Sequence, residues 1–201
     1  MDRTKLSQFN WLNEGTHSFE EEKMVIIAPP KSDFAYDNGM TSESGELPKS
    51  LNNAPYFYTE VEGDFVMSVN VSLTFKDTFD ASAIMIHHNE ECWAKACLER
   101  TDFNKNAVVS VVRNKTTDDA NGNHIEGNTV WLKVVRVGNS FSFHYSLNGE
   151  HYEMMRVFHL PVKETIKVGF VAQAPVGDGG ERYFSDYKLE NKTVKNIRDG
   201  Q

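Results

Sequence analysis

The sequence predicts an all-β fold, a two-sheet antiparallel β-sandwich of the jelly-roll type. Runs with a period of two recur along the chain, and no segment sustains a helical period. Gly, Asn and Asp separate these runs, as short turns require. The chain has 201 residues with 13 Phe, 7 Tyr and 3 Trp, rings that suit packing between two sheets. About ten or eleven strands are expected, a number typical of a jelly roll.

The first expected strand, 24–29, ends at a Pro pair and leads into a long polar segment at about 29–55. A loop of this length is uncommon in a compact domain, so it is either a disordered tract or a functional loop. Its aromatic pair, Phe34 and Tyr36, indicates that it packs on something. No linker or internal repeat divides the chain, so we expect residues 1–201 to form a single β-sandwich domain with a polar C-terminal tail.

The remaining expected strands form a meander with short turns. Glu62-Gly63, Gly138-Asn139 and Asn148-Gly149 provide hairpin signals, because Gly and Asn tolerate positive φ. Alternation is imperfect only near the end of the series. The strands are expected at 56–61, 64–75, 82–88, 92–100, 107–114, 129–138, 140–149, 151–160, 166–175 and 182–190.

The composition of the chain limits the classes of binding partner and indicates the cellular compartment. A net charge of −8 argues against nucleic acid and against an anionic membrane as partners. The N-terminal region has no apolar core of signal-peptide length, and nowhere do 18 apolar residues run together. Cys92 and Cys97 would lie on opposite faces of an extended chain, too far apart to bridge. We therefore expect a cytoplasmic protein.

The stretch "ECWAKACLER", residues 91–100, predicts a strand with two unlike faces. One face is small and apolar and should pack against the opposing sheet: Ala94, Ala96 and Leu98. The other face carries an indole, an ammonium, a thiol and a carboxylate: Trp93, Lys95, Cys97 and Glu99. We expect this second face to form the open, concave sheet of the sandwich.

The phrases "DASAIMIHHNEECWAKACLE" and "VWLKVVRVGNSFSFHYSLNGEHYEMMR" carry a family resemblance. Together with flanking phrases they extend over residues 56–187. The chain resembles the concanavalin A-like jelly-roll family of unknown function that includes the fungal "regulation of enolase protein". The resemblance implies a curved sandwich whose concave face, in the wider superfamily, often binds or cleaves glycans. It implies no reaction. A Ser-Asp-Trp-Ser motif common in the family is missing after Val112, which leaves the shape of that edge open.

A sugar site needs an apolar platform and charged hydrogen-bonding groups. Trp93 could stack on the axial hydrogens of a pyranose, while Lys95, Glu99 and Arg136 make charge-assisted hydrogen bonds to its hydroxyls. Tyr145 could add a hydroxyl or a second ring. The alternative for the charged residues is a ladder that stabilises the outside of a sheet, each exposed pair contributing about 0.2–1 kcal/mol.

Catalysis has weaker support than binding; if the chain is an enzyme, we expect a glycoside hydrolase-like activity. Glycoside hydrolysis needs two carboxyl groups across the scissile bond. The nearest cluster, Glu60, Glu62 and Asp64, is interrupted by a turn at Gly63. Glu99 is the best single catalytic candidate, and no Gly-x-Ser-x-Gly elbow occurs.

Metal binding is not expected, and no cofactor is implied. His87 and His88 are adjacent, so a strand would send their rings to opposite faces. "TTDDANGN", 116–123, offers oxygen ligands for calcium but lacks EF-hand spacing, and Asp and Asn are ordinary turn formers. Trp131 is expected to fill the core.

Three functions remain open. The first is a non-catalytic domain that binds a carbohydrate or sugar-like ligand on its concave sheet. The second is a protein-interaction or regulatory module without enzymatic activity. The third is a glycoside-active enzyme whose acid and base come from different strands.

Overall fold

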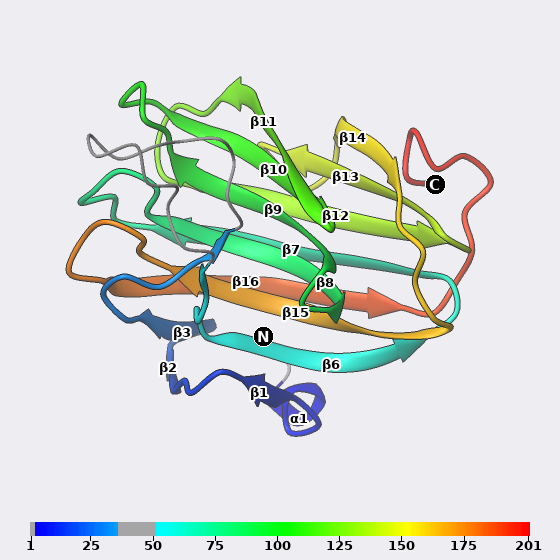
Figure 1. Cartoon of the computed structure of the whole chain (residues 1–201), viewed down its shortest axis with the longest axis horizontal. Coiled ribbons are helices and arrows are strands. Elements are labelled where there is room, and N and C mark those ends of the chain that lie inside the picture. Colours follow the sequence, from blue (N-terminus) through cyan, green and yellow to red (C-terminus); the bar gives the residue numbers. More distant parts are fainter. Residues whose placement is uncertain (1–2, 36–50) are drawn as a thin grey trace.

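Two antiparallel seven-stranded sheets stack into a sandwich in the computed structural model, which describes residues 3–35 and 51–201 (Figure 1). Sheet A has the spatial order β1 (Asn10–Leu12), β6 (Tyr56–Glu62), β15 (Thr165–Gln173), β8 (Ala81–Asn89), β9 (Cys92–Arg100), β10 (Asn106–Asn114) and β11 (Thr116–His124). Sheet B has the order β14 (Glu153–His159), β13 (Ser140–Ser146), β12 (Thr129–Val137), β7 (Phe65–Leu73), β16 (Gly180–Glu190), β3 (Lys23–Ala28) and β2 (His17–Glu20). The predicted all-β sandwich is confirmed.

Two small elements complete the described part. A two-stranded sheet joins β4 (Phe34–Ala35) to β5 (Leu51–Asn52), and one short helix, α1, spans Arg3–Leu6. No helix among residues 3–35 and 51–201 is long and apolar enough to cross a membrane.

The main core fills the space between the sheets, and alternation along each strand decides which side chains enter it. On β9 the core side consists of Ala94, Ala96 and Leu98, as expected from the sequence. On β12 it consists of Val130, Leu132 and Val134. Aromatic rings bridge the layers, and Phe170 of sheet A lies 5.1 Å from Phe184 of sheet B between ring centroids.

The expected hairpin turns are present where glycine permits them. Gly63 has a φ of 72° between β6 and β7, and Gly138 has a φ of 59° between β12 and β13. The imperfect alternation near the C-terminal end of the series also has a cause. A register irregularity in β16, with Asp186 at a φ of 52°, places Phe184 and Tyr187 on the same core side although they are three residues apart.

The segment 116–124 corrects the sequence analysis. The sequence predicts no strand here, but the segment forms β11, which pairs with β10 at the edge of sheet A. Its side chains are almost all exposed. A polar edge strand needs no apolar face and discourages pairing with other chains, which explains why its sequence lacks the usual strand signal.

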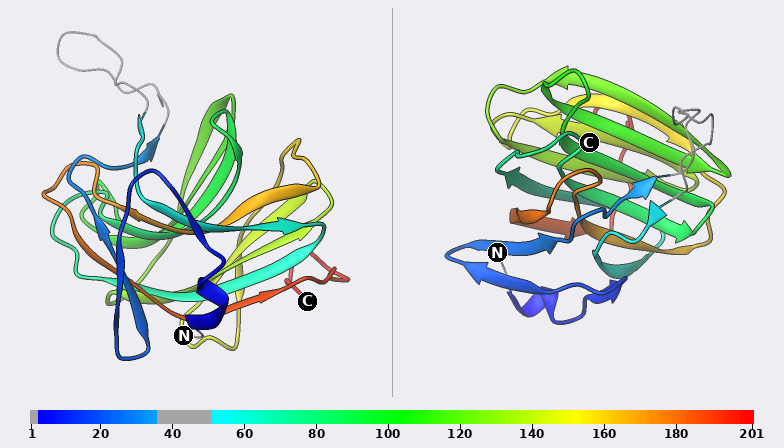
Figure 2. Two further views of the ribbon diagram at one scale, coloured as in Figure 1. Left: turned by 90° about the horizontal axis from the view of Figure 1, so that it is seen from below. Right: turned by 60° about the vertical axis from the view of Figure 1, so that its left-hand side comes forward.

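The long polar segment contributes a cover to sheet A. Ser32 pairs with Ala174 at the end of β15, and β4 follows on the side of sheet A that faces away from sheet B (Figure 2). Phe34 is buried there, which confirms that its ring packs on the sheet, whereas Tyr36 lies outside the described residues. The outer face of sheet A is therefore buried rather than open at this point.

Candidate functional site

The outward row of β9 forms the floor of the candidate site, on the face of sheet A that points away from sheet B. The face expected to be open is in fact covered, because all four of its side chains are buried: Trp93, Lys95, Cys97 and Glu99. Trp93 and Cys97 belong to a second hydrophobic cluster, distinct from the main core. A sheet face that carries two charged groups and is also buried is unusual, because desolvating a charge costs free energy unless partners compensate it.

Small residues surround the C-terminal end of this row, where Glu99 lies. Ala81 on β8 and Ala107 on β10 are the register neighbours of Glu99, and Ala83 is one of the neighbours of Cys97. On the next strand, Gly169 stands beside Met85. Because Ala81, Ala83 and Ala107 have short side chains, the sheet presents a low floor around Glu99, bordered by larger groups nearer Trp93.

Lys95 is held by partners from two other segments. Its Nζ donates to Asp33 Oδ1 at 2.8 Å and to Gln173 Oε1 at 2.9 Å. Its pKa lies above the ordinary value: burial opposes the charged form, but the carboxylate of Asp33 beside it more than compensates. The ammonium has three donors, and these two bonds use two of them.

Glu99 has no comparable partner among the described residues. Burial raises the pKa of this carboxyl to about 8; Lys95 opposes the shift, while Asp33 and Asp119 add to it. Glu99 is therefore mostly protonated at neutral pH, and it can donate one hydrogen bond and accept others. Residual exposure along this side of the face, 7% for Glu99, 3% for Val109 and 7% for Val111, indicates where solvent comes nearest.

Trp93 lies fully buried at the other end of the row. The ring of Phe34 packs against it edge-on at 6.0 Å between centroids. Its indole Nε1 has no hydrogen-bond partner, and neither has Nδ1 of His87, the register neighbour of Trp93 on β8. Burial lowers the pKa of His87 to about 4, so this ring is neutral at physiological pH. An unsatisfied buried donor costs about 1–3 kcal/mol, so both groups would gain from a polar ligand.

Cys97 is a structural rather than a reactive thiol. It is fully buried, and burial raises its pKa well above the ordinary value. Lys95 works in the opposite direction but does not prevail. Both cysteines are free, as expected from their positions on opposite faces of β9.

Arg136 and Tyr145 do not join this site, which corrects the expected five-residue set. Arg136 lies in sheet B and holds the connection that precedes β15, donating to the carbonyl oxygens of Glu164 at 2.6 Å and Lys163 at 2.9 Å. Tyr145 points into the main core from β13, and its hydroxyl donates to Glu153 at 2.7 Å. Periodicity places a residue on one of two faces but does not say which sheet contains the strand, and this is where the expectation failed.

The structure also shows where the other candidate residues lie: Trp131, the acidic cluster at 60–64 and the candidate metal ligands. Trp131 does not fill the main core: it alternates with Val130 and Leu132 and lies half-buried on the outer face of sheet B. Gly63 turns the chain after Glu62, so the acidic cluster at 60–64 presents no common catalytic face. Within residues 3–35 and 51–201, no three His, Cys, Asp or Glu side chains are grouped so that they could hold a metal ion. Asp118 and Asp119 are consecutive on a strand and so point to opposite sides.

Asp33 and Gln173 are the residues that sequence reasoning missed. They lie 62 and 78 positions from Lys95 along the chain and reach it only through the folding of the sheet and of the segment before β4. A weak signal existed, because Asp33 immediately precedes the aromatic residue that was expected to pack on the domain.

These sheets define the protein as a jelly-roll β-sandwich with a covered polar face on one sheet. The chain belongs to the family described as "Protein of unknown function (DUF1349)", whose model matches residues 11–192. A relative from Saccharomyces cerevisiae, "Regulation of enolase protein 1", is 25% identical over 201 residues, covering 98% of this chain and 96% of the relative.

Solved structures agree with the fold. A functionally unknown protein from Saccharomyces cerevisiae superposes with a TM-score of 0.82 at 22% identity, over 94% of this chain and 99% of that one. The carbohydrate-binding module CBM66 from Bacillus subtilis gives a TM-score of 0.57 at 14% identity, over 90% and 94%. A GH43 protein, BlXynB, from Bacillus licheniformis gives 0.72 at 12% identity over 92% of this chain, which corresponds to only 37% of the larger protein.

Proposed function

We propose that the outer face of sheet A binds a carbohydrate or sugar-like ligand without catalysing its conversion. The observation that carries the proposal is the buried row on β9, where polar groups without partners lie beside a low floor of small residues. Trp93 Nε1 and His87 Nδ1 lack partners, and Glu99 makes no hydrogen bond with any described residue. Hydroxyl groups of a sugar both donate and accept, so one ligand could satisfy all three.

The ligand would contact groups of complementary character. The protonated Glu99 carboxyl donates to one hydroxyl and accepts from another. The third donor of Lys95 adds a charge-assisted bond, which is stronger than a bond between neutral groups. Apolar edges of the sugar ring would lie over Val109 and Val111, which retain slight exposure and are the register neighbours of Cys97 and Lys95.

Binding is favoured over hydrolysis by the state of the carboxyl groups. Glycoside hydrolysis requires a charged carboxylate, or one that activates water, opposite the acid. Glu99 has the raised pKa of an acid, but the neighbouring Asp33 is already committed to Lys95 at 2.8 Å. Asp33 therefore serves to neutralise a buried ammonium and is not available as a nucleophile or base.

Access to the full row requires movement of the cover. Phe34 packs on Trp93 and also lies 6.3 Å from Tyr56 between ring centroids. A ligand that reaches the indole must displace this ring, whereas one that stops at Glu99 need not. The proposal therefore includes slow association for ligands that engage Trp93, because binding then waits for a conformational change.

The comparisons support a binding role only by analogy. CBM66 is named as a carbohydrate-binding module, and its fold resembles this one. The same analogy does not extend to catalysis, because this chain corresponds to a minor part of the GH43 protein. We also propose a cytoplasmic location, in keeping with two free cysteines.

A regulatory, protein-binding role is the second candidate. The name of the yeast relative, "Regulation of enolase protein 1", favours it. A stoichiometric protein partner recovered from cytosol by this chain, with no glycan bound by the purified protein, would support this role in place of the first.

Isothermal titration calorimetry with a panel of mono- and oligosaccharides tests the proposed function. Native protein should bind at least one sugar, and Trp93→Phe and Glu99→Gln should each weaken that binding by about tenfold or more. Trp131→Phe, on the outer face of the other sheet, is the matched control and should bind like native protein. Failure of every sugar to bind, or full binding by both site variants, would overturn the proposal. Unfolding midpoints of all variants show whether each is folded.

A further inference from the structure

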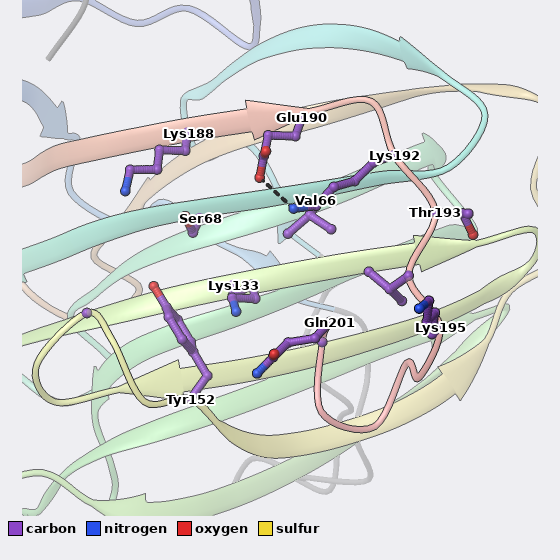
Figure 3. A pocket seen from close by; sticks show the side chains of 13 residues that line it. Val66, Ser68, Lys133, Tyr152, Lys188, Glu190, Lys192, Thr193, Lys195 and Gln201 are labelled. Atoms are coloured by element: carbon purple, nitrogen blue, oxygen red, sulfur yellow. Dashed lines mark ion pairs between the residues drawn. The ribbon is translucent and has the colours of Figure 1, made fainter.

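A groove on the outer face of sheet B is separate from the site on sheet A. Its volume is about 630 Å³, which lies within the range of small-molecule sites. The floor comes from β7, β12 and β16, and the segment after β16 forms one wall (Figure 3). Although the chain has a net charge of −8, four lysines line this groove: Lys133, Lys188, Lys192 and Lys195.

The floor places two of these lysines on either side of a serine. Ser68 on β7 is the register partner of Lys133 on β12 and of Lys188 on β16. Adjacent strands are about 4.8 Å apart, so the two lysine backbones are separated by roughly twice that distance. Two ammonium groups and a hydroxyl thus face the same space, which is an arrangement that suits an oxyanion of several oxygens.

Lys133 is fixed by an aromatic ring and partly withdrawn from water. Its Nζ lies 3.6 Å from the centroid of Tyr152, a cation–π contact, and the side chain is half-buried. Burial, followed by the nearby charge of Lys192, lowers its pKa; Asp199 and Glu190 act in the opposite direction. A bound anion would relieve both the desolvation and the repulsion.

The acidic groups near the groove do not cancel its charge. Glu190 is the one acidic side chain among the described residues that line the groove, and it pairs at 2.9 Å with Lys192 in an exposed position. Glu190 also attracts Lys188 and Lys133, and Asp199 attracts Lys133, so the four lysines of the groove outnumber these two carboxylates. Figure 3 shows that side chains from the sheet and from the C-terminal segment line the same groove.

Hydrogen bonds hold the C-terminal segment against the sheet. Ser142 Oγ on β13 donates to the carbonyl oxygen of Ile197 at 2.8 Å. The backbone N–H groups of Lys195 and Asn196 both donate to the carbonyl oxygen of Gln201, which closes a turn. The wall that carries Lys195 is therefore anchored, so the groove is largely formed before a ligand arrives.

We propose that this groove is a second binding site, which takes a small phosphate-bearing molecule. Four ammonium groups that line one groove favour a multiply charged oxyanion over a neutral sugar. The volume of about 630 Å³, in a groove that is open to solvent, matches a metabolite-sized ligand better than a polymer or a membrane surface. The site on sheet A shares no residue with the groove, so either proposal can fail without the other.

Calorimetry with a hexose 6-phosphate, the same hexose without phosphate, and inorganic phosphate tests the second site. The phosphorylated sugar should bind, the parent sugar should not bind in the groove, and added salt should weaken the interaction. Lys133→Gln and Lys188→Gln should each reduce affinity by about tenfold. Lys23→Gln is the matched control, because Lys23 also stacks on a tyrosine of sheet B, 5.8 Å from the Tyr183 centroid, but does not line the groove.

The fluorescence of Trp131 reports on binding in the groove independently of the affinity measured by calorimetry. Its ring packs against Gly149, a residue that lines the groove: a Cβ added to Gly149 would lie 3.0 Å from the indole. Fluorescence of Trp131 should change on titration with the phosphorylated sugar and not in Lys133→Gln. No binding by either phosphate compound, equal binding of the parent sugar at this site, or binding unchanged by both lysine variants would overturn the proposal. Binding to anionic vesicles alone would overturn it in favour of a membrane surface.

Discussion

Replacing Glu99 by Gln should change how the stability of the protein depends on pH. The folded protein raises the pKa of this carboxyl from 4.5 to about 8, chiefly by burial. Between these values the folded state keeps a proton that the unfolded state releases. The free energy of unfolding of native protein therefore falls as pH rises through this window, and Gln, which has no proton to lose, abolishes that contribution.

The size of the effect follows from the shift. Each pKa unit corresponds to about 1.4 kcal/mol, so the stability of Glu99→Gln relative to native protein should increase by roughly 3 to 4 kcal/mol between about pH 5 and pH 8. Buried His87 and His144, both with pKa values lowered to about 4, contribute in the opposite direction, but they are common to both proteins and cancel in the difference.

Urea unfolding followed by circular dichroism at several pH values measures this difference by linear extrapolation. Glu60→Gln, at an exposed position on β6 of the same sheet, is the control for replacing a carboxyl group by an amide. Parallel stability profiles for native protein and Glu99→Gln across the window would refute the reasoning, because they would mean that Glu99 ionises as it does in water.

Three further predictions concern the surroundings of the two sites. Asp33→Asn should lower the free energy of unfolding by about 3 kcal/mol, because it leaves the buried Lys95 ammonium without its carboxylate. Adding Lys95→Met should recover most of this loss. Urea unfolding of both variants measures the two changes, and a double variant as unstable as Asp33→Asn would contradict the prediction. Gly169→Ala should lower the free energy of unfolding by more than about 2 kcal/mol or prevent folding, because the added Cβ would lie 2.1 Å from the Phe57 carbonyl oxygen. A soluble variant with the unfolding free energy of native protein would show that the two strands are not so close. His144→Gln should lose less stability than native protein as pH falls from about 6.5 to 4, because burial lowers the pKa of this histidine to about 4 and the unfolded state takes up its proton first. The same acid dependence of the unfolding temperature in both proteins would count against this prediction.

The sequence predicted the faces of β9 correctly because alternation is a local property. Ala94 and Leu98 enter the main core, and Trp93 lies on the opposite face, as their spacing requires. What lies above that face depends on contacts between distant segments. Asp33 and Phe34 reach it from 62 and 59 positions away, so the cover and the counter-ion of Lys95 could not be predicted from spacing.

Arg136 shows the same limit in a different form. Its strand was predicted correctly, but alternation alone does not assign a strand to a sheet, and Arg136 lies in sheet B. The edge strand β11 escaped detection for another reason: an exposed strand has no apolar face to generate a periodic signal. Hydrophobic alternation thus predicts strands that have a buried face and does not detect strands that are exposed on both faces.

The most direct measurement of the proposed function is the indole N–H resonance of Trp93 in a ¹H–¹⁵N NMR titration with a sugar that calorimetry shows to bind. The indole has no hydrogen-bond partner in the free protein, so a ligand that satisfies it should shift this resonance and slow its exchange with solvent. The resonances of Trp11 and Trp131 should stay in place. A saturable sugar complex in which the Trp93 resonance does not move, while another tryptophan responds, would contradict the assignment of the ligand to sheet A.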